Sequence, residues 1–338
     1  MNDLMKVQAQ EIATIIEQKR KAADPFTTTG LISQATGKEL ADTFIDLTIN
    51  ESKFLSMIRT HRTNRPAGDI TKLTVSGYVL RGATENSAAT ETRRPTTSAV
   101  SYSTKKLVGA IDLSGEVGED NIEGEGGRNT IMNSMLAQIA NNWEELAIEG
   151  DESVVGATDY AALVSANDGF NALASLANGS HILSAAGGKA SYALLTKMLR
   201  QMPTKYRDKS RLRFFVSADS FQDLVDEQAA RVTQDADAVR ASGMLSTRVG
   251  VPIVEIPLWP QDLAITGTAS LGTFILLCDP QNLINVIQRD IRIEWQRQSR
   301  KDIDEGTVFM RNDFVIENHD AVVKATNVSI DTAASYYS

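Results

Sequence analysis

The sequence is poor in the residues that most redox and metal sites require. Its 338 residues include one cysteine and three histidines. A single cysteine excludes an internal disulfide, and the apolar run FILLC around Cys278 predicts a buried structural thiol rather than a nucleophile. Because His61, His181 and His319 have no second His or Cys at the spacing of metal ligands, we expect no zinc site and no cofactor.

Long apolar runs are also lacking, and none approaches the roughly 20 residues that cross a membrane. In the N-terminal stretch MNDLMKVQAQEIATIIEQKR the apolar residues Ile12, Ile15 and Ile16 are interrupted by charge, which predicts an amphipathic helix rather than a signal peptide. We therefore expect synthesis and folding in the cytoplasm and no membrane partner.

Positive charge is not in excess. The formal net charge of −9 disfavours a dedicated nucleic-acid binder, because such proteins neutralise phosphates with Lys and Arg. Basic stretches at 61–65, 93–94 and 205–213 are explained by solvated charge or by ion pairs between subunits. Any contact with DNA is expected to be weak and non-specific.

Catalytic motifs are missing as well. The stretch 187–189 (GGK) looks like the end of a phosphate loop, but Ala190 stands where the loop needs Ser or Thr. The Ser-x-x-Lys match at 103–106 lies in a predicted strand without its companion motifs. Acid pairs such as 144–145 are expected on solvated faces or in turns. No catalytic residue is predicted, so the sequence disfavours an enzyme.

The chain does contain a long predicted hairpin. Residues 72–79 (KLTVSGYV) and 107–113 (LVGAIDL) alternate apolar and polar positions, which predicts two paired strands. The segment 81–98 between them has no large aliphatic or aromatic residue and cannot build a core. Because unpaired strand edges recruit other chains, such an arm is typical of a subunit that lies on its neighbours in a large assembly.

The strongest helical pattern follows at 128–149 and ends at Gly150. Its apolar face is predicted to contain Met132, Met135, Leu136, Ile139, Trp143 and Leu146. The segment 151–188 is expected to be mostly loop with one short helix. From Lys189 onward helices and strands alternate, which predicts a mixed α/β domain, and 283–328 is rich in predicted strands.

This order of arm, hairpin, acidic joint, long helix, α/β domain and closing strands resembles the major capsid proteins of tailed bacteriophages, the HK97-like family. The resemblance covers nearly the whole chain and rests on the order of its segments rather than on one diagnostic motif. The segments are INESKFLSMIRTHR (49–62), STKKLVGAIDLSGEVGED (103–120), NNWEELAIEGD (141–151), FFVSADSFQDL (214–224), RVGVPIVEIP (248–257), GTFILLCDP (272–280) and the stretch 292–328.

The resemblance implies an α+β, HK97-like fold in five parts. They are an N-terminal arm at 1–62, an extended hairpin called the E-loop at 63–112, a peripheral domain at 113–185 with a spine helix at 128–149, a mixed α/β axial domain at 186–289, and return strands of the peripheral domain at 290–338. The residues expected to form the structural spine are Met132, Leu136, Ile139, Trp143 and Leu146. The residues expected at the assembly interface are Arg65, Arg81, Arg93, Arg94, Glu116, Glu119, Glu123 and Glu125.

The function that the resemblance implies is a structural one. The chain would assemble with itself, as hexamers and pentamers, into an icosahedral phage head around double-stranded DNA. Its further partners would be a portal protein and separate scaffolding or decoration proteins, and its location would be the virion, assembled in the host cytoplasm. Some relatives join subunits by an isopeptide bond from an E-loop Lys to an Asn, assisted by a Glu. The corresponding stretch 306–310 (GTVFM) offers neither partner, so we expect a shell without covalent cross-links.

Two alternatives remain open at this stage. An encapsulin-like nanocompartment shell would share the fold but enclose an enzyme cargo, and the neighbouring genes would separate it from a phage head. A soluble α/β enzyme would need converging polar groups in a pocket, and no motif supplies them.

Overall fold

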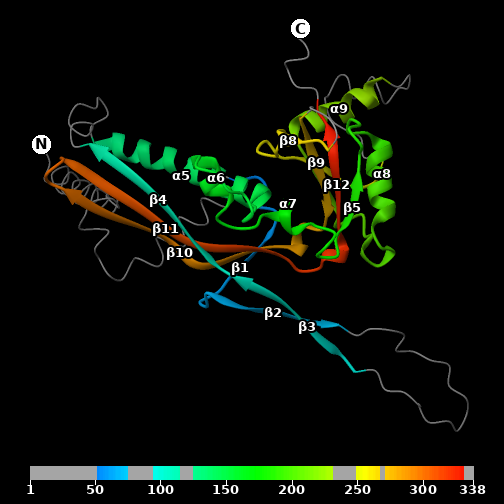
Figure 1. The fold of residues 1–338 in the computed structure, drawn as a ribbon, viewed down its shortest axis with the longest axis horizontal. Coiled ribbons are helices and arrows are strands. Elements are labelled where there is room, and N and C mark those ends of the chain that lie inside the picture. The colour runs from blue at the N-terminus through cyan, green and yellow to red at the C-terminus, as the bar shows by residue number, and fades with distance from the viewer. Residues whose placement is uncertain (1–51, 75–93, 115–124, 231–248, 267–270, 331–338) are drawn as a thin grey trace, which may run out of the picture. The chain divides into compact units, whose positions relative to one another are not determined.

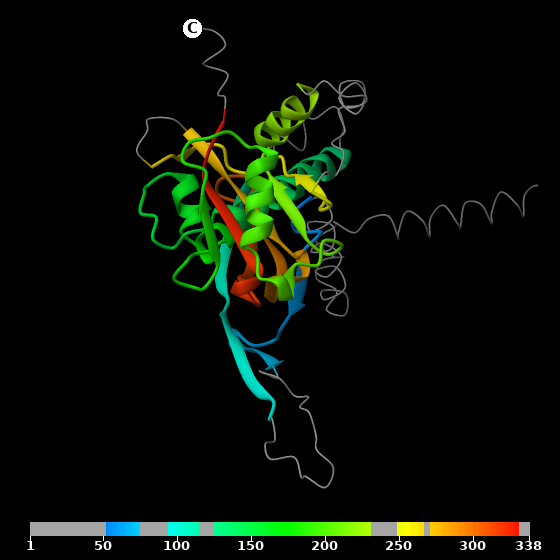
Figure 2. The same cartoon turned by 90° about the vertical axis from the view of Figure 1, so that its right-hand side faces the viewer.

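The structure is a computed structural model that describes residues 52–74, 94–114, 125–230, 249–266 and 271–330 (Figures 1 and 2). These residues form an α+β fold that contains two β-sheets and a separate two-stranded ribbon. Most of the predicted N-terminal arm lies outside the described residues.

The strands are β1 (Arg59–Arg62), β2 (Ala67–Thr74), β3 (Thr96–Ser103), β4 (Lys105–Ser114), β5 (His181–Ser184), β6 (Arg213–Val216), β7 (Ile253–Glu255), β8 (Leu263–Ala264), β9 (Leu271–Cys278), β10 (Leu283–Gln298), β11 (Ile303–Ile316) and β12 (Val322–Ser329). The helices are α5 (Glu125–Glu149), α6 (Asp159–Val164), α7 (Phe170–Leu173), α8 (Tyr192–Gln201) and α9 (Ala218–Ala229), with short 3₁₀ turns η1 (Thr204–Tyr206), η2 (Pro280–Asn282) and η3 (His319–Ala321).

The first sheet, here called the long sheet, has the strand order β1-β10-β11-β4 within the described residues. Its centre is the antiparallel hairpin of β10 and β11, the two longest strands, and β4 pairs antiparallel with the outer side of β11. The hairpin turns tightly at Asp302, where φ is 53° and Arg297 Nη2 donates to the Asp302 carboxylate at 2.5 Å.

The second sheet, here called the mixed sheet, has the order β5-β12-β9-β6-β7, with β8 paired to β9. Helix α8 and strands β6, β9 and β12 share one apolar core with part of α9. Ser191 and Ser217 cap α8 and α9 by accepting hydrogen bonds from backbone N–H groups in the first turn, as expected for helix N-termini. The predicted mixed α/β domain is therefore confirmed in its element types. Cys278 lies fully buried in β9 as a free thiol, and burial raises its pKa.

After the helical passage from β4 to β5, the chain crosses directly between the two sheets twice more, at η2 and at η3. These two crossings correct the predicted grouping of strands. Strand β9 of the mixed sheet continues through η2 into β10 of the long sheet, and β11 returns through η3 into β12 of the mixed sheet. The segment 290–338 was predicted to return to a single domain, but its last strand, β12, pairs with β9 and β5. Strand β5, at 181–184, also joins the mixed sheet although it precedes 186. Strand partners depend on tertiary packing, which a local pattern does not reveal.

Helix α5 confirms the predicted long helix and begins three residues earlier, at Glu125. Trp143 is 2% exposed and Leu146 is fully buried, while Ile139 is half-buried. The side chains of Met132 and Leu136 lie outside the described residues. Helix α5 contacts α6 and α7, and α7 contacts β11, so α7 links the helix to the long sheet.

The segment after the long helix is more ordered than the sequence predicted. It contains α6, α7 and β5 where one short helix was expected. Gly150 ends α5 against another glycine, because a Cβ atom at Gly150 would lie 2.2 Å from the Asn167 carbonyl oxygen and 2.7 Å from the Gly169 nitrogen. This close approach of two backbones is available to glycine and is invisible in a helical pattern.

The predicted hairpin exists, but its second arm was assigned to the wrong strand. Strand β2 pairs with β3, so that Ala67 lies opposite Ser103 and Thr74 opposite Thr96. The segment 107–113 lies in β4 instead and pairs with β11 in the long sheet. Alternation correctly marked 107–113 as a strand, but a period of two identifies the faces of a strand and not its partner.

Candidate assembly surfaces

The ribbon of β2 and β3 is fastened to the long sheet at its base. Tyr102 is buried against Ile284, Val286 and Val315, and its hydroxyl lies 2.9 Å from Thr63 Oγ1. A Cβ atom at Gly68, opposite Tyr102 in the ribbon, would lie 2.6 Å from that hydroxyl. The packing at the base of the ribbon therefore requires both the ring of Tyr102 and a glycine at position 68, where a side chain would clash with it.

Hydrogen bonds hold the same junction. The Ser103 N–H donates to Asp313 Oδ2 at 2.7 Å, and both the N–H and the hydroxyl of Thr104 donate to the Pro66 carbonyl. Burial raises the pKa of Asp313, and the hydrogen bonds that it accepts from the backbone oppose this shift. The contacts fix the ribbon to β11 at the point where the chain passes from β3 into β4.

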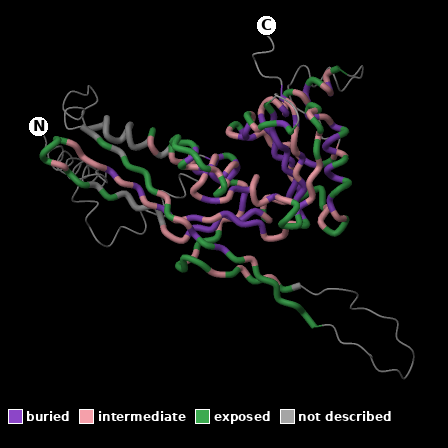
Figure 3. Tube along the Cα trace, viewed as in Figure 1, coloured by how far each residue is buried: buried purple, intermediate pink, exposed green. Residues whose placement is uncertain are grey.

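Beyond this base the ribbon is exposed. Figure 3 shows β2 and β3 mostly in the colour of exposed residues, and Leu73 is 73% exposed. Only Ile70 and Val100 of the ribbon's other apolar side chains pack against the buried cluster at its base. The described part of this subunit therefore offers no cover for the outer ribbon.

Strand β4 supplies a second candidate surface. Within the described residues it pairs with β11 on one side only, so its other edge carries unpaired backbone groups. Val108 is 58% exposed on this strand, and Lys106 lies with its Nζ 4.4 Å from the centroid of the Phe309 ring. A ten-residue strand at the edge of the described sheet is a ready template for pairing with another chain.

The structure describes only part of the predicted charged interface. Arg65 and Arg94 are exposed at the ribbon, and neither makes an ion pair with any residue that the structure describes. Glu125 is the first residue of α5, and its side chain lies outside the described set. The other predicted interface residues outside the described residues are Arg81, Arg93, Glu116, Glu119 and Glu123. Pairing between these bases and acids stays a prediction.

Sequence reasoning did not identify the anchor where the arm joins the body. Phe54 is fully buried, and its ring centroid lies 5.2 Å from that of Phe215, 5.7 Å from that of Phe170 and 5.8 Å from that of Trp259. Phe170 in turn packs 5.6 Å from Phe314 of β11. Phe215 belongs to the mixed sheet and Phe314 to the long sheet. Phe54 therefore sits in an aromatic cluster that joins both sheets to α7.

A buried carboxylate fastens the same segment to the long helix. Glu144 is 3% exposed, and its side chain accepts hydrogen bonds from the Ser52 hydroxyl at 2.5 Å and from the Phe54 N–H at 3.2 Å. The expectation of a solvated acid pair at 144–145 was wrong for Glu144. Its position along the helix could have indicated this burial, because Glu144 lies four residues from both Ala140 and Ile148, which are buried on the same helix face.

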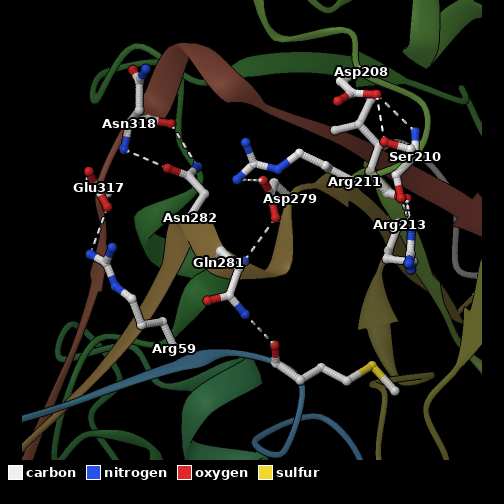
Figure 4. A network of polar contacts seen from close by, with 12 residues as sticks. Arg59, Asp208, Ser210, Arg211, Arg213, Asp279, Gln281, Asn282, Glu317 and Asn318 are labelled. Atoms are coloured by element: carbon white, nitrogen blue, oxygen red, sulfur yellow. Dashed lines mark hydrogen bonds and ion pairs between the residues drawn. The ribbon is translucent and has the colours of Figure 1, made fainter.

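The two chain crossings between the sheets are tied together by a polar network (Figure 4). Asn282 Nδ2 donates to the Asn318 carbonyl at 2.9 Å, and the Asn318 N–H donates to Asn282 Oδ1 at 2.9 Å. The Glu317 N–H donates to the Asn282 carbonyl. Arg211, from the loop before β6, pairs with Asp279 at 2.7 Å. The side chain of Asn282 thus bridges the η2 crossing to the η3 crossing.

The end of the arm also contacts this network. Arg59 of β1 pairs with Glu317 at 2.6 Å, and Gln281 Nε2 donates to the Met57 carbonyl at 3.4 Å. Strand β1 itself adds to the long sheet in parallel with β10. The segment 52–62 is therefore held by helix α5, by the aromatic cluster and by both crossings.

The described residues contain no group of three or more His, Cys, Asp or Glu side chains that could hold a metal ion. In that same part of the chain, no helix is both long enough and apolar enough to cross a membrane.

Comparison with known proteins points to one family. A profile described as the phage capsid family matches residues 36–327. The chain is 32% identical over 292 residues to YqbE of Bacillus subtilis (strain 168), which is named as a prophage capsid protein, and the match covers 85% of this chain and 91% of that protein.

Solved structures agree in fold. A subunit of the satellite phage P4 procapsid matches with a TM-score of 0.58 at 12% identity, over 86% of this chain and 99% of that one. The capsid of a native GTA particle matches with a TM-score of 0.58 at 17% identity, over 82% and 91%. The SrpI encapsulin of Synechococcus elongatus PCC 7942 matches with a TM-score of 0.52 at 11% identity, over 82% and 88%. At such identities the likeness concerns the fold alone.

Proposed function

Because the chain belongs to the phage capsid family, we propose that it is the major capsid protein of a tailed bacteriophage and assembles into an icosahedral shell around double-stranded DNA. Its α+β fold is the HK97-like fold that the sequence resemblance implied. The observation that carries the proposal is the ribbon. Its base is packed against the long sheet through Tyr102, and its outer part is exposed in the described subunit.

Assembly through exposed strands explains the two candidate surfaces. The ribbon would lie on a neighbouring subunit, and the open edge of β4 would pair with or pack against another chain in hexamers and pentamers. Each exposed ion pair at Arg65 or Arg94 would contribute only about 0.2–1 kcal/mol, but a closed shell repeats every contact many times. The proposal also includes a portal and separate scaffolding or decoration proteins as partners, weak contact with the packaged DNA, and assembly in the host cytoplasm.

Two of the three lysines in the segment 63–112 support a shell without covalent cross-links. Lys105 forms an ion pair with Glu152, and Lys106 stacks on Phe309, so both are engaged within their own subunit. The backbone position opposite Lys105 on β11 is Asn312, but that side chain is fully buried. Neither lysine is presented to a neighbouring carboxamide by the described contacts.

A denaturing gel tests the absence of cross-links. Particles boiled in detergent with reductant should give one band at the monomer mass of 36.7 kDa, because non-covalent contacts do not survive this treatment. A ladder of covalent multimers would refute this part of the proposal, and mass spectrometry of the ladder would identify the joined residues.

Electron microscopy of the purified protein tests the shell itself and the role of the ribbon. The unmodified chain should form closed particles, whereas deletion of 82–93 should leave a folded subunit that forms none. A point substitution provides a finer test, since Leu73 and Leu176 are each 73% exposed. Leu73→Asp, on the ribbon, should reduce particle yield at least about tenfold, because a loss of about 1.4 kcal/mol weakens a single contact tenfold and a closed shell repeats that contact many times.

Leu176→Asp, on the loop after α7, makes the same chemical change away from the ribbon and should leave the yield near that of the unmodified chain. Circular dichroism should show unchanged secondary structure in all three variants. If the deletion variant and Leu73→Asp both assemble with normal yield, neither the segment 82–93 nor the ribbon is the assembly element.

The content of the particles separates a phage head from an encapsulin-like shell. Particles from the natural source should contain double-stranded DNA that nuclease cannot reach. An enzyme cargo in place of DNA would favour the nanocompartment function, which the fold accommodates equally.

A further inference from the structure

A pocket of about 270 Å³ opens on the mixed sheet, away from the surfaces discussed above. Val323 and Ala325 of β12 point into the core shared with α8, so Lys324 and Thr326 between and beside them face the opposite side of the sheet. Lys324 lines the pocket there together with Phe274 of β9. The pocket therefore lies on the face of the sheet that α8 does not cover.

Lys324 is the one charged residue among those that line the pocket. Its Nζ donates to the Asn171 carbonyl at 2.7 Å and lies 5.6 Å from the centroid of the Phe274 ring. No carboxylate of the described residues forms an ion pair with it. An ammonium group has three donors, and one of the three is used by the contact to Asn171.

The partial burial of this ammonium group has an electrostatic consequence. Burial lowers the pKa of Lys324 to about 8, because desolvation disfavours the charged form and no neighbouring acid restores it. An anion that enters the pocket would supply the missing opposite charge and accept a hydrogen bond from a group already oriented by Asn171 and Phe274. Leu263, Ala264 and Ile265 form an apolar part of the lining that suits a carbon skeleton, and the remaining residues include the polar Asn171, Thr273, Thr326 and Asn327.

We propose that this pocket binds a small organic carboxylate, with the carboxylate group on Lys324 Nζ and an apolar body against Phe274, Leu263 and Ile265. The volume admits a ligand of the size of benzoate but not a folded peptide. Thr326 also lines the pocket. The site uses no residue of the ribbon, of β4 or of the arm anchor, so it does not depend on the proposed shell function.

Titration of the purified full-length chain with benzoate at pH 7 tests the site, since most Lys324 is protonated at that pH. Saturable binding should be seen by calorimetry or by ligand-observed NMR, and benzyl alcohol, which has the same ring but no charge, should bind at least about tenfold more weakly. Lys324→Met keeps the length and apolar stem of the side chain and should weaken benzoate binding by a similar factor. Lys301→Met, at the exposed turn between β10 and β11, is the matched control and should leave binding unchanged.

A second measurement avoids any effect of the substitutions on folding. In the unmodified chain, benzoate should slow reductive methylation of Lys324, followed by peptide mass spectrometry, and should leave the rate at Lys301 unchanged. Equal binding of benzoate and benzyl alcohol, retained binding in Lys324→Met, or no protection of Lys324 would each overturn the proposal. Benzoate binding that is present in dissociated subunits and lost in assembled particles would also overturn it, in favour of a carboxylate supplied by a neighbouring copy.

Discussion

Replacement of Phe54 by alanine should lower the free energy of unfolding of the subunit by about 3–5 kcal/mol, the usual range for a fully buried aromatic residue. The side chain has no exposed surface and makes edge-to-face contacts with Phe170, Phe215 and Trp259. Each such pair adds about 0.5–1.5 kcal/mol beyond the burial of apolar area. The loss should be large because this ring contacts α7 and the mixed sheet directly and reaches Phe314 of the long sheet through Phe170.

Urea denaturation of unassembled subunits measures this loss, with Leu176→Ala as the control. Leu176 is 73% exposed, so its truncation should change the free energy of unfolding by no more than about 0.5 kcal/mol. A Phe54→Ala variant as stable as the control would mean that the arm anchor does not form in the free subunit. That result would leave the remainder of the fold intact but would remove the segment 52–62 from its core.

Replacement of Trp143 by alanine should have a comparable effect, about 3–5 kcal/mol, because the indole is 2% exposed on the long helix. Its Nε1 donates to no described residue, so Trp143→Phe removes volume without removing a hydrogen bond and should cost less than Trp143→Ala. The same urea experiment on unassembled subunits compares the two variants.

A negligible loss for Trp143→Ala would place this face of α5 in solvent. It would also contradict the arrangement in which the neighbouring Glu144 holds Ser52 and Phe54. The order of stability expected is therefore unmodified chain, Trp143→Phe and Trp143→Ala, from most to least stable.

Local patterns predicted most of the elements but not how they pair. The helix at 128–149, the alternating helices and strands from Lys189 onward and the C-terminal strands were expected from spacing, and the structure has them. Strand β5 was not expected, because 151–188 was predicted to be mostly loop. The pattern at 107–113 indicated a strand correctly, yet its partner proved to be β11 rather than β2. An alternating pattern shows that a segment is a strand, but it does not show which other strand it pairs with. Packing between distant parts of the chain decides the pairing.

For the candidate assembly surfaces as well, the sequence predicted some features and only the structure showed others. The prediction that a hairpin would lie on other subunits followed from a polar stretch with no large aliphatic or aromatic residue to bury. That Tyr102 and Gly68 fasten its base to the long sheet did not follow, because the two residues meet only after β2 and β3 have paired. The charged residues predicted at the interface remain predictions, since most of them lie outside the described residues.

By itself the sequence determined the class of protein: one cysteine, few histidines, no catalytic motif, and an ordered series of weak signals that together indicate a capsid subunit. Only the tertiary structure decided which strands share a sheet, why Glu144 is buried, and how Asn282 ties one crossing to the other. The physical reason is the range of the interactions. Helical and strand periodicity arises from residues a few positions apart, whereas Glu144 meets a partner 92 positions away and Asn282 one 36 positions away. A local pattern does not identify partners so far away in the chain, and these contacts are the ones that hold the segment 52–62 and the two sheets together.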